Sequence, residues 1–278
     1  MRFTKMEGLG NDYVYVNGFE ETVADPETLA RAISDRHFGA GSDGLVLILP
    51  SDRADFRMRM FNADGSEAEM CGNAARCVGR YVFERGLTRR RELTLETGAG
   101  IKLLLLSGAG ERVDAVRVDM GLPELRPAEI PVRLEGDRAI DVPIALEGEK
   151  WSMTCVSMGN PHAVIFVPDA EHADVEGIGP RLERHPLFPQ RANIEFATVL
   201  DSRHIRMRVW ERGSGETMAC GTGACATAVA AVLGGRCGRD LTISLNGGDL
   251  RVIWDEKTGH VLQEGPANFV YDGTWLRG

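Results

Sequence analysis

The chain has 278 residues, and at about 150 residues per domain this length predicts two domains. It carries 32 Lys and Arg against 41 Asp and Glu, and the net charge of −9 argues against nucleic acid or an anionic membrane as the main partner. Its six cysteines are far too few for a disulfide scaffold, no signal peptide opens the sequence, and the longest apolar stretch is only about ten residues. We therefore expect a soluble, cytoplasmic protein whose thiols stay reduced.

The first half of the chain predicts a mixture of strands and two helices. An amphipathic helix is expected at 29–37, and a second helix begins after Cys71 and Gly72 with the apolar Ala74 and Val78 on one face. The strands are identified by their β-branched and aromatic residues and by alternation. They are expected at 13–16, 44–49, 56–61, 93–96 and 101–106.

The second half predicts the same kinds of element in the same order. A Pro- and Glu-rich segment at 121–148 is interpreted as the crossover between the halves together with an early strand. The helix that follows Cys220 is small or apolar almost all round, which predicts burial on most sides. Residues 268–276 are expected to return to the first half. Strands are expected at 163–167, 194–199, 205–210, 241–244 and 250–254.

A shift of the chain by 149 residues aligns three separate blocks with one another. GNDYVYV (10–16) aligns with GNPHAVI (159–165), FRMRMFN (56–62) with IRMRVWE (205–211), and EAEMCGNAA (67–75) with ETMACGTGA (216–224). Coincidence between glycine-rich turns is the alternative explanation, but one ungapped offset for three blocks is hard to obtain in that way. We infer two related halves, in which Cys71 falls on Cys220.

These elements predict an α/β fold of the α+β type with two pseudo-symmetric halves. Each half is expected to be a mainly antiparallel sheet curled around one central helix. Residues 1–119 plus 267–278 should form the half that carries Cys71, and residues 120–266 the half that carries Cys220. We expect the active site in the cleft between the two halves.

Cys71 and Cys220 each stand directly before a glycine at the start of a predicted helix. A helix start presents unpaired N–H groups and a partial positive charge, which favours a thiolate, lowers the pKa of a cysteine and can hold a carboxylate. Either cysteine alone is more simply explained as a buried core thiol, but the repeat places both at matching positions and so favours a function. The remaining thiols are expected to be core or incidental; they are Cys77, Cys155, Cys225 and Cys237.

Two related halves with one thiol each suit the inversion of a stereocentre. One thiolate removes a proton from one face of a carbon, and one thiol delivers a proton to the other face. Helix starts that converge on a carboxylate would stabilise the enolate-like charge that develops.

No cofactor and no metal are expected for this chemistry. Pyridoxal phosphate needs a Schiff-base lysine, and the four lysines of the chain lie outside these motifs. Neither a CxxC nor an HExxH spacing occurs, and the cysteines are poorly spaced for a joint set of metal ligands.

The residues described above resemble the diaminopimelate epimerase family, whose members use two thiols and no pyridoxal phosphate in lysine and peptidoglycan-precursor biosynthesis. The resemblance covers nearly the whole chain, and its blocks stand in family order and spacing. They are GNDYV, GSDGLVLI, FNADGSEAEMCGNAARC, GNPHAV, NIEF and ERGSGETMACGTGACA. The resemblance implies a PLP-independent amino-acid epimerase, an isomerase that interconverts LL-diaminopimelate and meso-diaminopimelate, and it suggests a homodimer.

The resemblance also implies roles for individual residues. Cys71 and Cys220 would be the base and the acid on opposite faces of the α-carbon, and His162 and Glu211 would assist ionisation of the thiols. Arg212 suits a bidentate contact with the distal carboxylate, and Glu211 could meet an ammonium. The backbone amides that would grip the reacting carboxylate belong to Gly72, Asn73, Gly221 and Thr222. The residues that would hold the rest of the substrate are Asn11, Asn62, Asn160, Asn193, Glu211 and Arg212.

Each of these residues also has a purely structural explanation. Asn11 and Asn160 could cap turns, His162 could be an ordinary turn histidine, and Arg212 could pair with an acidic neighbour on the surface. Their clustering around the two-thiol motif at matched offsets favours the functional interpretation.

The sequence departs from the family pattern at two positions. Gly44 stands where some members carry Gln, which puts a ligand contact at this residue in doubt. Thr222 stands where some members carry Ser, and this exchange should keep the amide contact.

Other functions remain open at this point. A proline or hydroxyproline racemase on the same fold would use a similar thiol pair but would not need several amides plus Arg212 for a second amino-acid head. A phenazine-biosynthesis isomerase places an acidic residue where a thiol stands here. A thiol redox protein is disfavoured by the lack of CxxC, and a binding module that has lost catalysis is disfavoured by the retention of both thiols.

Overall fold

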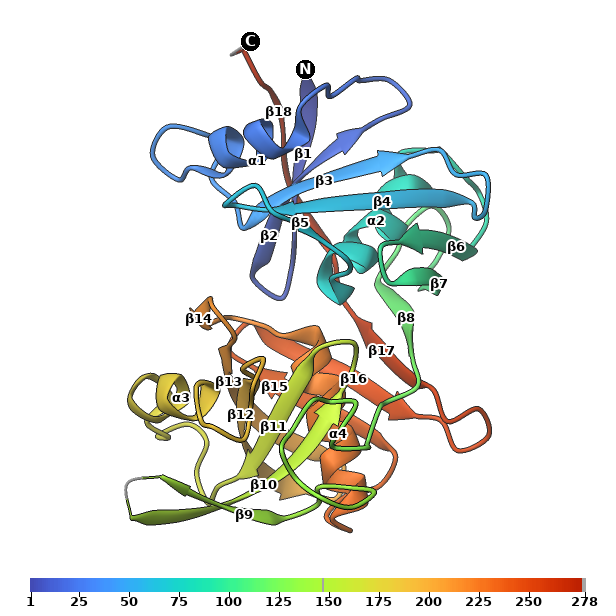
Figure 1. The fold of residues 1–278 in the computed structure, drawn as a ribbon. Helices are drawn as coiled ribbons and strands as arrows, with labels where there is room; N and C mark the ends of the chain where they lie inside the picture. The colour runs from blue at the N-terminus through green and yellow to red at the C-terminus, as the bar shows by residue number, and fades with distance from the viewer. Residues whose placement is uncertain (147, 277–278) are drawn as a thin grey trace. The chain divides into compact units, whose positions relative to one another are not determined.

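The two halves of the chain fold into matching series of strands and helices, with an additional strand at the start of the second, in the computed structural model, which describes residues 1–146 and 148–276 (Figure 1). The first unit contains Met1–Asp119 and the residues from Glu264 onward, and the second contains Met120–Gln263. The chain returns to the first unit at Glu264, whereas the expected position is 267, and Glu264 forms an ion pair with Arg117 of the same unit at 2.7 Å. Residue 147 of the expected second half and residues 277–278 of the expected first half lie outside the described residues.

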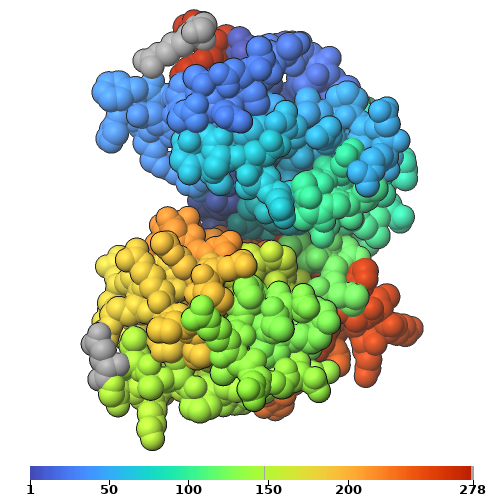
Figure 2. All heavy atoms as spheres, viewed as in Figure 1, coloured from blue at the N-terminus to red at the C-terminus, as the bar shows by residue number. Residues whose placement is uncertain are grey.

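The sheet of the first unit is mainly antiparallel. Antiparallel pairs join β1 (Arg2–Gly8) to β2 (Asn11–Asn17) and to β18 (Asn268–Thr274), β3 (Gly44–Leu49) to β4 (Phe56–Asn62), β4 to β5 (Glu67–Ala68), and β6 (Glu92–Thr97) through β7 (Gly100–Ser107) to β8 (Ala115–Gly121). The parallel pairs are β2–β3 and β4–β6. In the space-filling view the red C-terminal residues lie beside blue N-terminal ones, as the β1–β18 pair requires (Figure 2).

The sheet of the second unit repeats this pattern. Antiparallel pairs join β9 (Val142–Leu146), β10 (Glu149–Ser157) and β11 (Pro161–Phe166) in turn, β12 (Asn193–Asp201) to β13 (His204–Glu211), β13 to β14 (Gly215–Glu216), and β15 (Asp240–Leu245) to β16 (Gly248–Trp254). The parallel pairs are β11–β12 and β13–β15. β17 (Val261–Gly265) then leads back to the first unit.

The repeat extends to individual strand partners and to the helices. Tyr13 pairs with Gly44, and His162 pairs with Asn193, so both members of the pair are shifted by 149 residues. The same shift relates α1 (Pro26–Ser34) to α3 (Val175–Glu183) and α2 (Gly72–Glu84) to α4 (Gly221–Leu233). The predicted fold class, two related halves with a mainly antiparallel sheet and a central helix in each, is confirmed.

Helix α1 begins and ends three residues earlier than the predicted 29–37. Asp25 caps its start by accepting a hydrogen bond from the Thr28 amide at 3.1 Å, and Pro26 occupies its first turn. Asp35 ends it, because its carboxylate accepts the amides of His37 and Phe38 at 2.8 Å each and so draws them out of the helical pattern.

The two central helices are almost completely buried, which the sequence predicts for α4 but not for α2, where it predicts a single apolar face. Helix α4 packs against β10, β11, β12, β13, β15 and β16, and ten of its thirteen residues are buried. Eleven of the thirteen residues of α2 are buried, and Gly79 allows Val116 and Leu104 to approach to within about 3.3 Å of where a side chain would begin. Within the described ranges, no helix combines the length and the apolar character that a membrane span requires.

Candidate functional site

In the first unit Cys71 is the N-cap residue of α2, with an extended backbone (φ −138°, ψ 125°). Its thiol donates to the side-chain oxygen of Asn11 at 3.5 Å. The same oxygen accepts a hydrogen bond from the Asn73 side chain at 3.4 Å. The structure therefore brings three of the predicted residues together around one helix start.

A buried arginine that the sequence analysis did not single out supports this group. Arg76 has no exposed surface, and its guanidinium donates to the side-chain oxygen of Asn73 at 2.8 Å and to the Pro266 carbonyl at 3.1 Å. Asn73 is the second residue of α2, so the guanidinium lies near the start of the helix. Arg76 thus ties the Asn73 side chain and the returning chain to the start of α2.

Two other predicted positions of the first unit lie on neighbouring strands. Asn62, at the end of β4, donates to the Ser66 hydroxyl at 3.0 Å and pairs in register with Gly44. A side chain at Gly44 would begin 2.0 Å from the Phe61 carbonyl oxygen and 2.7 Å from the Tyr13 ring. Position 44 in this chain therefore offers backbone only, which is a physical reason for the departure from Gln.

In the second unit Cys220 is the N-cap residue of α4, again with an extended backbone (φ −114°, ψ 107°). The sulfur accepts the Gly223 amide at 3.4 Å and lies 3.5 Å from the Thr222 hydroxyl. Cys220 is 5% exposed, whereas Cys71 is partly exposed. The two predicted thiols therefore share a backbone position but differ in their access to water.

Two carboxylates flank the Cys220 sulfur. Glu211, at the end of β13, forms hydrogen bonds with the Thr217 hydroxyl at 2.6 Å and with Cys220 itself. Glu195 lies on β12 and is completely buried. Burial raises the pKa of Cys220 well above its ordinary value, and the negative charges of Glu211 and Glu195 raise it further.

The expectation that a helix start lowers the pKa of its cysteine is wrong for Cys220. The Gly223 amide and the Thr222 hydroxyl do stabilise a thiolate, as the sequence suggests. Loss of water around the sulfur and the two nearby carboxylates outweigh them. At neutral pH this environment holds Cys220 as a thiol.

His162 lies at the start of β11 and is completely buried. Its Nδ1 lies 2.6 Å from Glu195 Oε1, and its Nε2 lies 3.0 Å from the side-chain oxygen of Asn160. The structure brings His162 and Asn160 together through the ring. Glu195 was missed as a site residue, although a charged residue between Ile194 and Phe196 in an apolar strand was a usable signal.

Asn193 and Arg212 form a second linked pair. The Asn193 side chain donates to the Pro161 carbonyl at 3.0 Å and accepts the Arg212 amide at 2.8 Å. The Arg212 guanidinium is exposed and donates to the Gln190 carbonyl at 3.1 Å. Asn193 thus joins the ends of β11 and β13 across β12, next to the His162 pair.

The remaining cysteines have the surroundings of structural thiols. Cys77, Cys155 and Cys225 are buried in the cores of their units, and burial raises the pKa of Cys77 and of Cys155 to about 12. Cys237 is partly exposed. None of the six cysteines, all of which are described, forms a disulfide.

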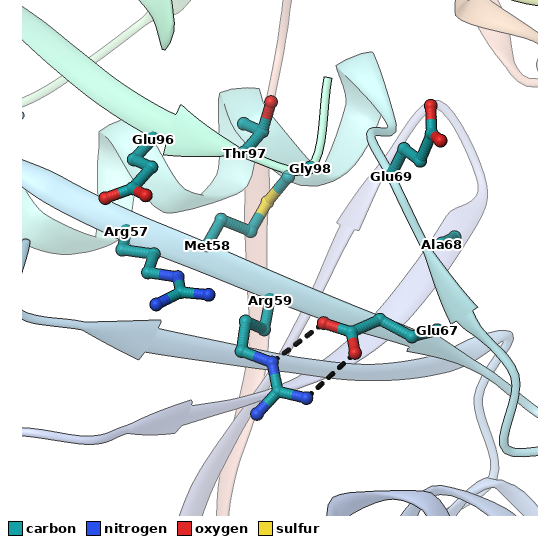
Figure 3. A pocket seen from close by; sticks show the side chains of 9 residues that line it. All are labelled: Arg57, Met58, Arg59, Glu67, Ala68, Glu69, Glu96, Thr97 and Gly98. Atoms are coloured by element: carbon teal, nitrogen blue, oxygen red, sulfur yellow. Dashed lines mark hydrogen bonds and ion pairs between the residues drawn. The ribbon is translucent and has the colours of Figure 1, made fainter. Parts of the chain in front are cut away.

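A hollow of about 180 Å³ in the first unit contains none of the predicted site residues. Its lining comes from β4, β5 and the end of β6, and it includes the two-pronged ion pair of Arg59 with Glu67 (Figure 3). Gly98 packs against the backbone of Glu69 there, two residues before Cys71. Among the residues that the structure describes, no three His, Cys, Asp or Glu side chains are grouped to hold a metal ion.

Comparison with known proteins gives relatives over almost the full length of the chain. The curated diaminopimelate epimerases of Acetivibrio thermocellus and Desulfovibrio desulfuricans are each 57% identical to it, over 273 and 281 residues. These matches cover 98% and 99% of this chain and 98% of each relative. The enzyme of Methanococcus maripaludis is 52% identical over 98% of this chain and 99% of its own.

Solved structures resemble the fold at much lower identity. A probable proline racemase from Agrobacterium radiobacter K84 has a TM-score of 0.73 at 17% identity and covers 99% of this chain and 92% of its own. A phenazine biosynthesis protein of the PhzF family from Bacillus anthracis has a TM-score of 0.72 at 19% identity and covers 100% and 99%. These likenesses show the fold alone.

The matching family model has the same name as the curated relatives, whereas the two structural neighbours have other names. The family model described as diaminopimelate epimerase matches residues 3–126 and 154–270, which include both Cys-Gly helix starts. The resemblance inferred from the sequence motifs is confirmed. The chain belongs to the diaminopimelate epimerase family.

Proposed function

We propose that this chain interconverts LL-diaminopimelate and meso-diaminopimelate by proton transfer between its thiols and the α-carbon, without pyridoxal phosphate. The observation that carries the proposal is the pair of matched helix starts, each with a cysteine as N-cap and a glycine as first helical residue. Family membership supports the substrate, and the cysteines supply groups that can act as acid and as base.

Cys71 and Cys220 have complementary roles in the proposed reaction. The surroundings of Cys220 favour a thiol, so Cys220 delivers a proton to one face of the α-carbon and Cys71 removes the proton from the other face. The product leaves with the protonation states of the two sulfurs exchanged, and the reverse reaction restores them. His162 and Glu211 are proposed to assist these changes of charge.

The other predicted residues bind the substrate in this proposal. The amides of Gly72, Asn73, Gly221 and Thr222 hold the reacting carboxylate, since the start of a helix favours negative charge. The exposed guanidinium of Arg212 binds the distal carboxylate, and Glu211 faces an ammonium. The side chains of Asn11, Asn62, Asn160 and Asn193 complete the contacts. We also propose that the enzyme works as a homodimer in the cytoplasm, which size-exclusion chromatography with light scattering and cell fractionation would test.

Replacing either thiol tests the acid and base assignment. Cys71→Ala and Cys220→Ala should each lower the rate of epimerisation by roughly 100-fold or more, because each removes one proton-transfer group. Cys225→Ala on the same helix as Cys220, and the partly exposed Cys237→Ala, are the matched controls and should retain activity. Epimerisation at near wild-type rate by either of the first two variants would refute the two-thiol mechanism.

Solvent isotope incorporation tests the reaction itself. In deuterated water, LL-diaminopimelate should acquire deuterium at one α-carbon with inversion and with no added cofactor. Proline and hydroxyproline should acquire none under the same conditions. Turnover of proline but not of diaminopimelate would favour the racemase alternative.

A further inference from the structure

Glu195 is a buried carboxylate that has no counterpart at the matching position of the first half. It lies on β12 with no exposed surface, and one of its oxygens, Oε2, has no hydrogen-bond partner among the described residues. The matching position in the first half is Val46, which is buried in the sheet as an apolar residue. Burying a carboxylate where the related half keeps a valine is costly, so a role for the charge is expected.

The carboxylate of Glu195 holds the ring of His162. Nδ1 lies 2.6 Å from Glu195 Oε1, and both side chains are completely buried. Because a carboxylate only accepts, Nδ1 carries a hydrogen. The ring therefore has its other nitrogen, Nε2, directed at the side-chain amide of Asn160, 3.0 Å away.

Two arrangements of the Asn160 amide satisfy this contact. In the first, Nε2 also carries a hydrogen and donates to the amide oxygen, and the amide NH2 is left for another partner. In the second, Nε2 is bare, the amide NH2 donates to it, and the oxygen is left outward. The structure has the first arrangement, because the atom of Asn160 that lies 3.0 Å from Nε2 is the amide oxygen.

The start of α4 is shaped to admit this carboxylate. A side chain on Gly223 would begin 2.8 Å from Glu195 Oε1 and 3.2 Å from the Cys220 sulfur. The matching residue of the first half is Ala74, which stands with the apolar Val46. The first half thus has alanine at this helix position and valine on the strand, and the second half has glycine and glutamate. The glycine leaves the space that the Glu195 carboxylate occupies.

We propose that Glu195 is a positioning residue: through His162 it fixes the Asn160 amide with its NH2 group turned toward a carboxylate of the substrate. An amide NH2 donates to a carboxylate, whereas an amide oxygen in its place would repel it. The inference rests on the proposed function, in which Asn160 contacts the substrate. Glu195 acts through another residue and touches no reacting atom itself.

Nitrogen NMR of the unliganded protein tests the first step without any assay of activity. In protein labelled with ¹⁵N-histidine, both ring nitrogens of His162, assigned with His162→Gln, should have the shifts of nitrogen that carries a hydrogen, as the first arrangement requires. In Glu195→Gln one of them should move to the range of bare nitrogen. Glu183→Gln, which alters another buried glutamate of the second unit, should leave the His162 signals in place.

A double-mutant cycle tests the second step. Glu195→Gln should raise KM for diaminopimelate by roughly tenfold or more with a smaller change in kcat, since it turns a substrate contact without removing a thiol. Asn160→Ala should do the same, and the double variant should be no worse than Asn160→Ala alone. Glu195→Asp, which keeps the charge, should recover part of the loss and serves in place of Glu195→Gln if that variant does not fold.

The outcomes separate this inference from the proposed function. Unchanged His162 signals in Glu195→Gln, or effects of the two single variants that multiply in the double variant, would overturn the positioning role. Activity that survives loss of either thiol would overturn the proposed function and would leave the NMR result standing.

Discussion

Glu211 and Glu216 lie five residues apart in the second unit, and the structure gives their carboxyl groups opposite surroundings. Glu211 loses water beside Cys220, which raises its pKa, although hydrogen bonds from Thr217 and Cys220 oppose the effect. Glu216 forms a two-pronged ion pair with Arg208 at 2.7 and 2.9 Å, which lowers its pKa. When folding raises the pKa of a carboxyl group, ionisation of that group lowers the stability of the folded protein. Glu211 is such a group.

Substitution of these two glutamates should change stability with opposite signs. Because the pKa of Glu211 is raised in the folded state, the stability it contributes is present at low pH and lost as pH rises through that pKa. Glu211→Gln should therefore be more stable than the wild type at about pH 8 and no more stable at about pH 4, while its epimerase activity falls. Urea unfolding at the two pH values measures the difference.

Glu216→Gln is the matched comparison. The lowered pKa of Glu216 contributes stability above the unfolded value, and that contribution is lost as pH falls through the folded value. This variant should be less stable than the wild type at about pH 8. The difference between their free energies of unfolding should become smaller as the pH is lowered. A Glu211→Gln protein that is less stable than the wild type at the higher pH would contradict our account of Glu211.

The central helices are the elements on which both halves of the proposed site depend. Each is buried nearly all round, so its first turn is held against the sheet and the N-cap sulfur has a fixed place. The two helices differ at their third residue, which is Ala74 in α2 and Gly223 in α4. This difference gives a test in which each half serves as the control for the other.

Gly223→Ala should lower epimerase activity by roughly tenfold or more, because the added methyl group would push on Glu195 and on the Cys220 sulfur. The reciprocal change, Ala74→Gly, adds no atoms and should reduce the free energy of unfolding by up to about 1 kcal/mol with little effect on the rate. Steady-state kinetics and thermal unfolding of the two variants check this. Equal epimerisation rates for Gly223→Ala and the wild type would contradict this prediction, because they would show that the added methyl group does not disturb Glu195 or the Cys220 sulfur.

The sequence predicts the central helices and most inner strands, because the apolar residues of α2 and of the strands recur with a clear period and those of α4 are almost continuous. It does not predict α3 directly, since Gly177, Gly179 and Pro180 all disfavour a helix. Tertiary packing overrides these propensities: Asp174 caps the start, and Gly179 lies against the Trp210 side chain. The repeat could have located α3, because it begins 149 residues after α1.

For the proposed site, the sequence motifs identify the N-cap cysteines and the residues around them. They do not reveal that Cys220 is held as a thiol, because that depends on burial and on carboxylates from two other strands. Arg76 was missed because a lone arginine in a helix usually reaches solvent, whereas this one is fully buried against Pro266 from the far end of the chain.

At the scale of the whole molecule, the two related halves place charged residues at different positions of the repeat. The first unit places the cation of Arg76 near its helix start, and the matching residue of the second unit is the neutral Cys225. The second unit places Glu195 and Glu211 beside its thiol, and the matching residues of the first are Val46 and Asn62. Two halves with one ancestral pattern thus present different electrostatic surroundings to their cysteines.

If both thiols act on one carbon, mild oxidation should join them. We predict that diamide treatment links Cys71 to Cys220 and inactivates the enzyme, and that dithiothreitol restores activity, because the disulfide consumes both proton-transfer groups and its reduction returns them. Peptide mapping identifies the linked residues, and Cys237→Ala should behave as the wild type does. Oxidised, inactive protein in which this pair is unlinked would contradict the prediction.

The path of the chain through the two units has a consequence for synthesis on the ribosome. The second unit is made of one continuous segment, Met120–Gln263, so all of its strands have emerged before the first unit is complete. The first unit lacks β18 until residues 268–274 are made, after the whole of the second unit, and one edge of β1 has no partner strand before then. The nascent chain therefore carries an open sheet edge while the second unit is made, and β18 covers this edge afterwards.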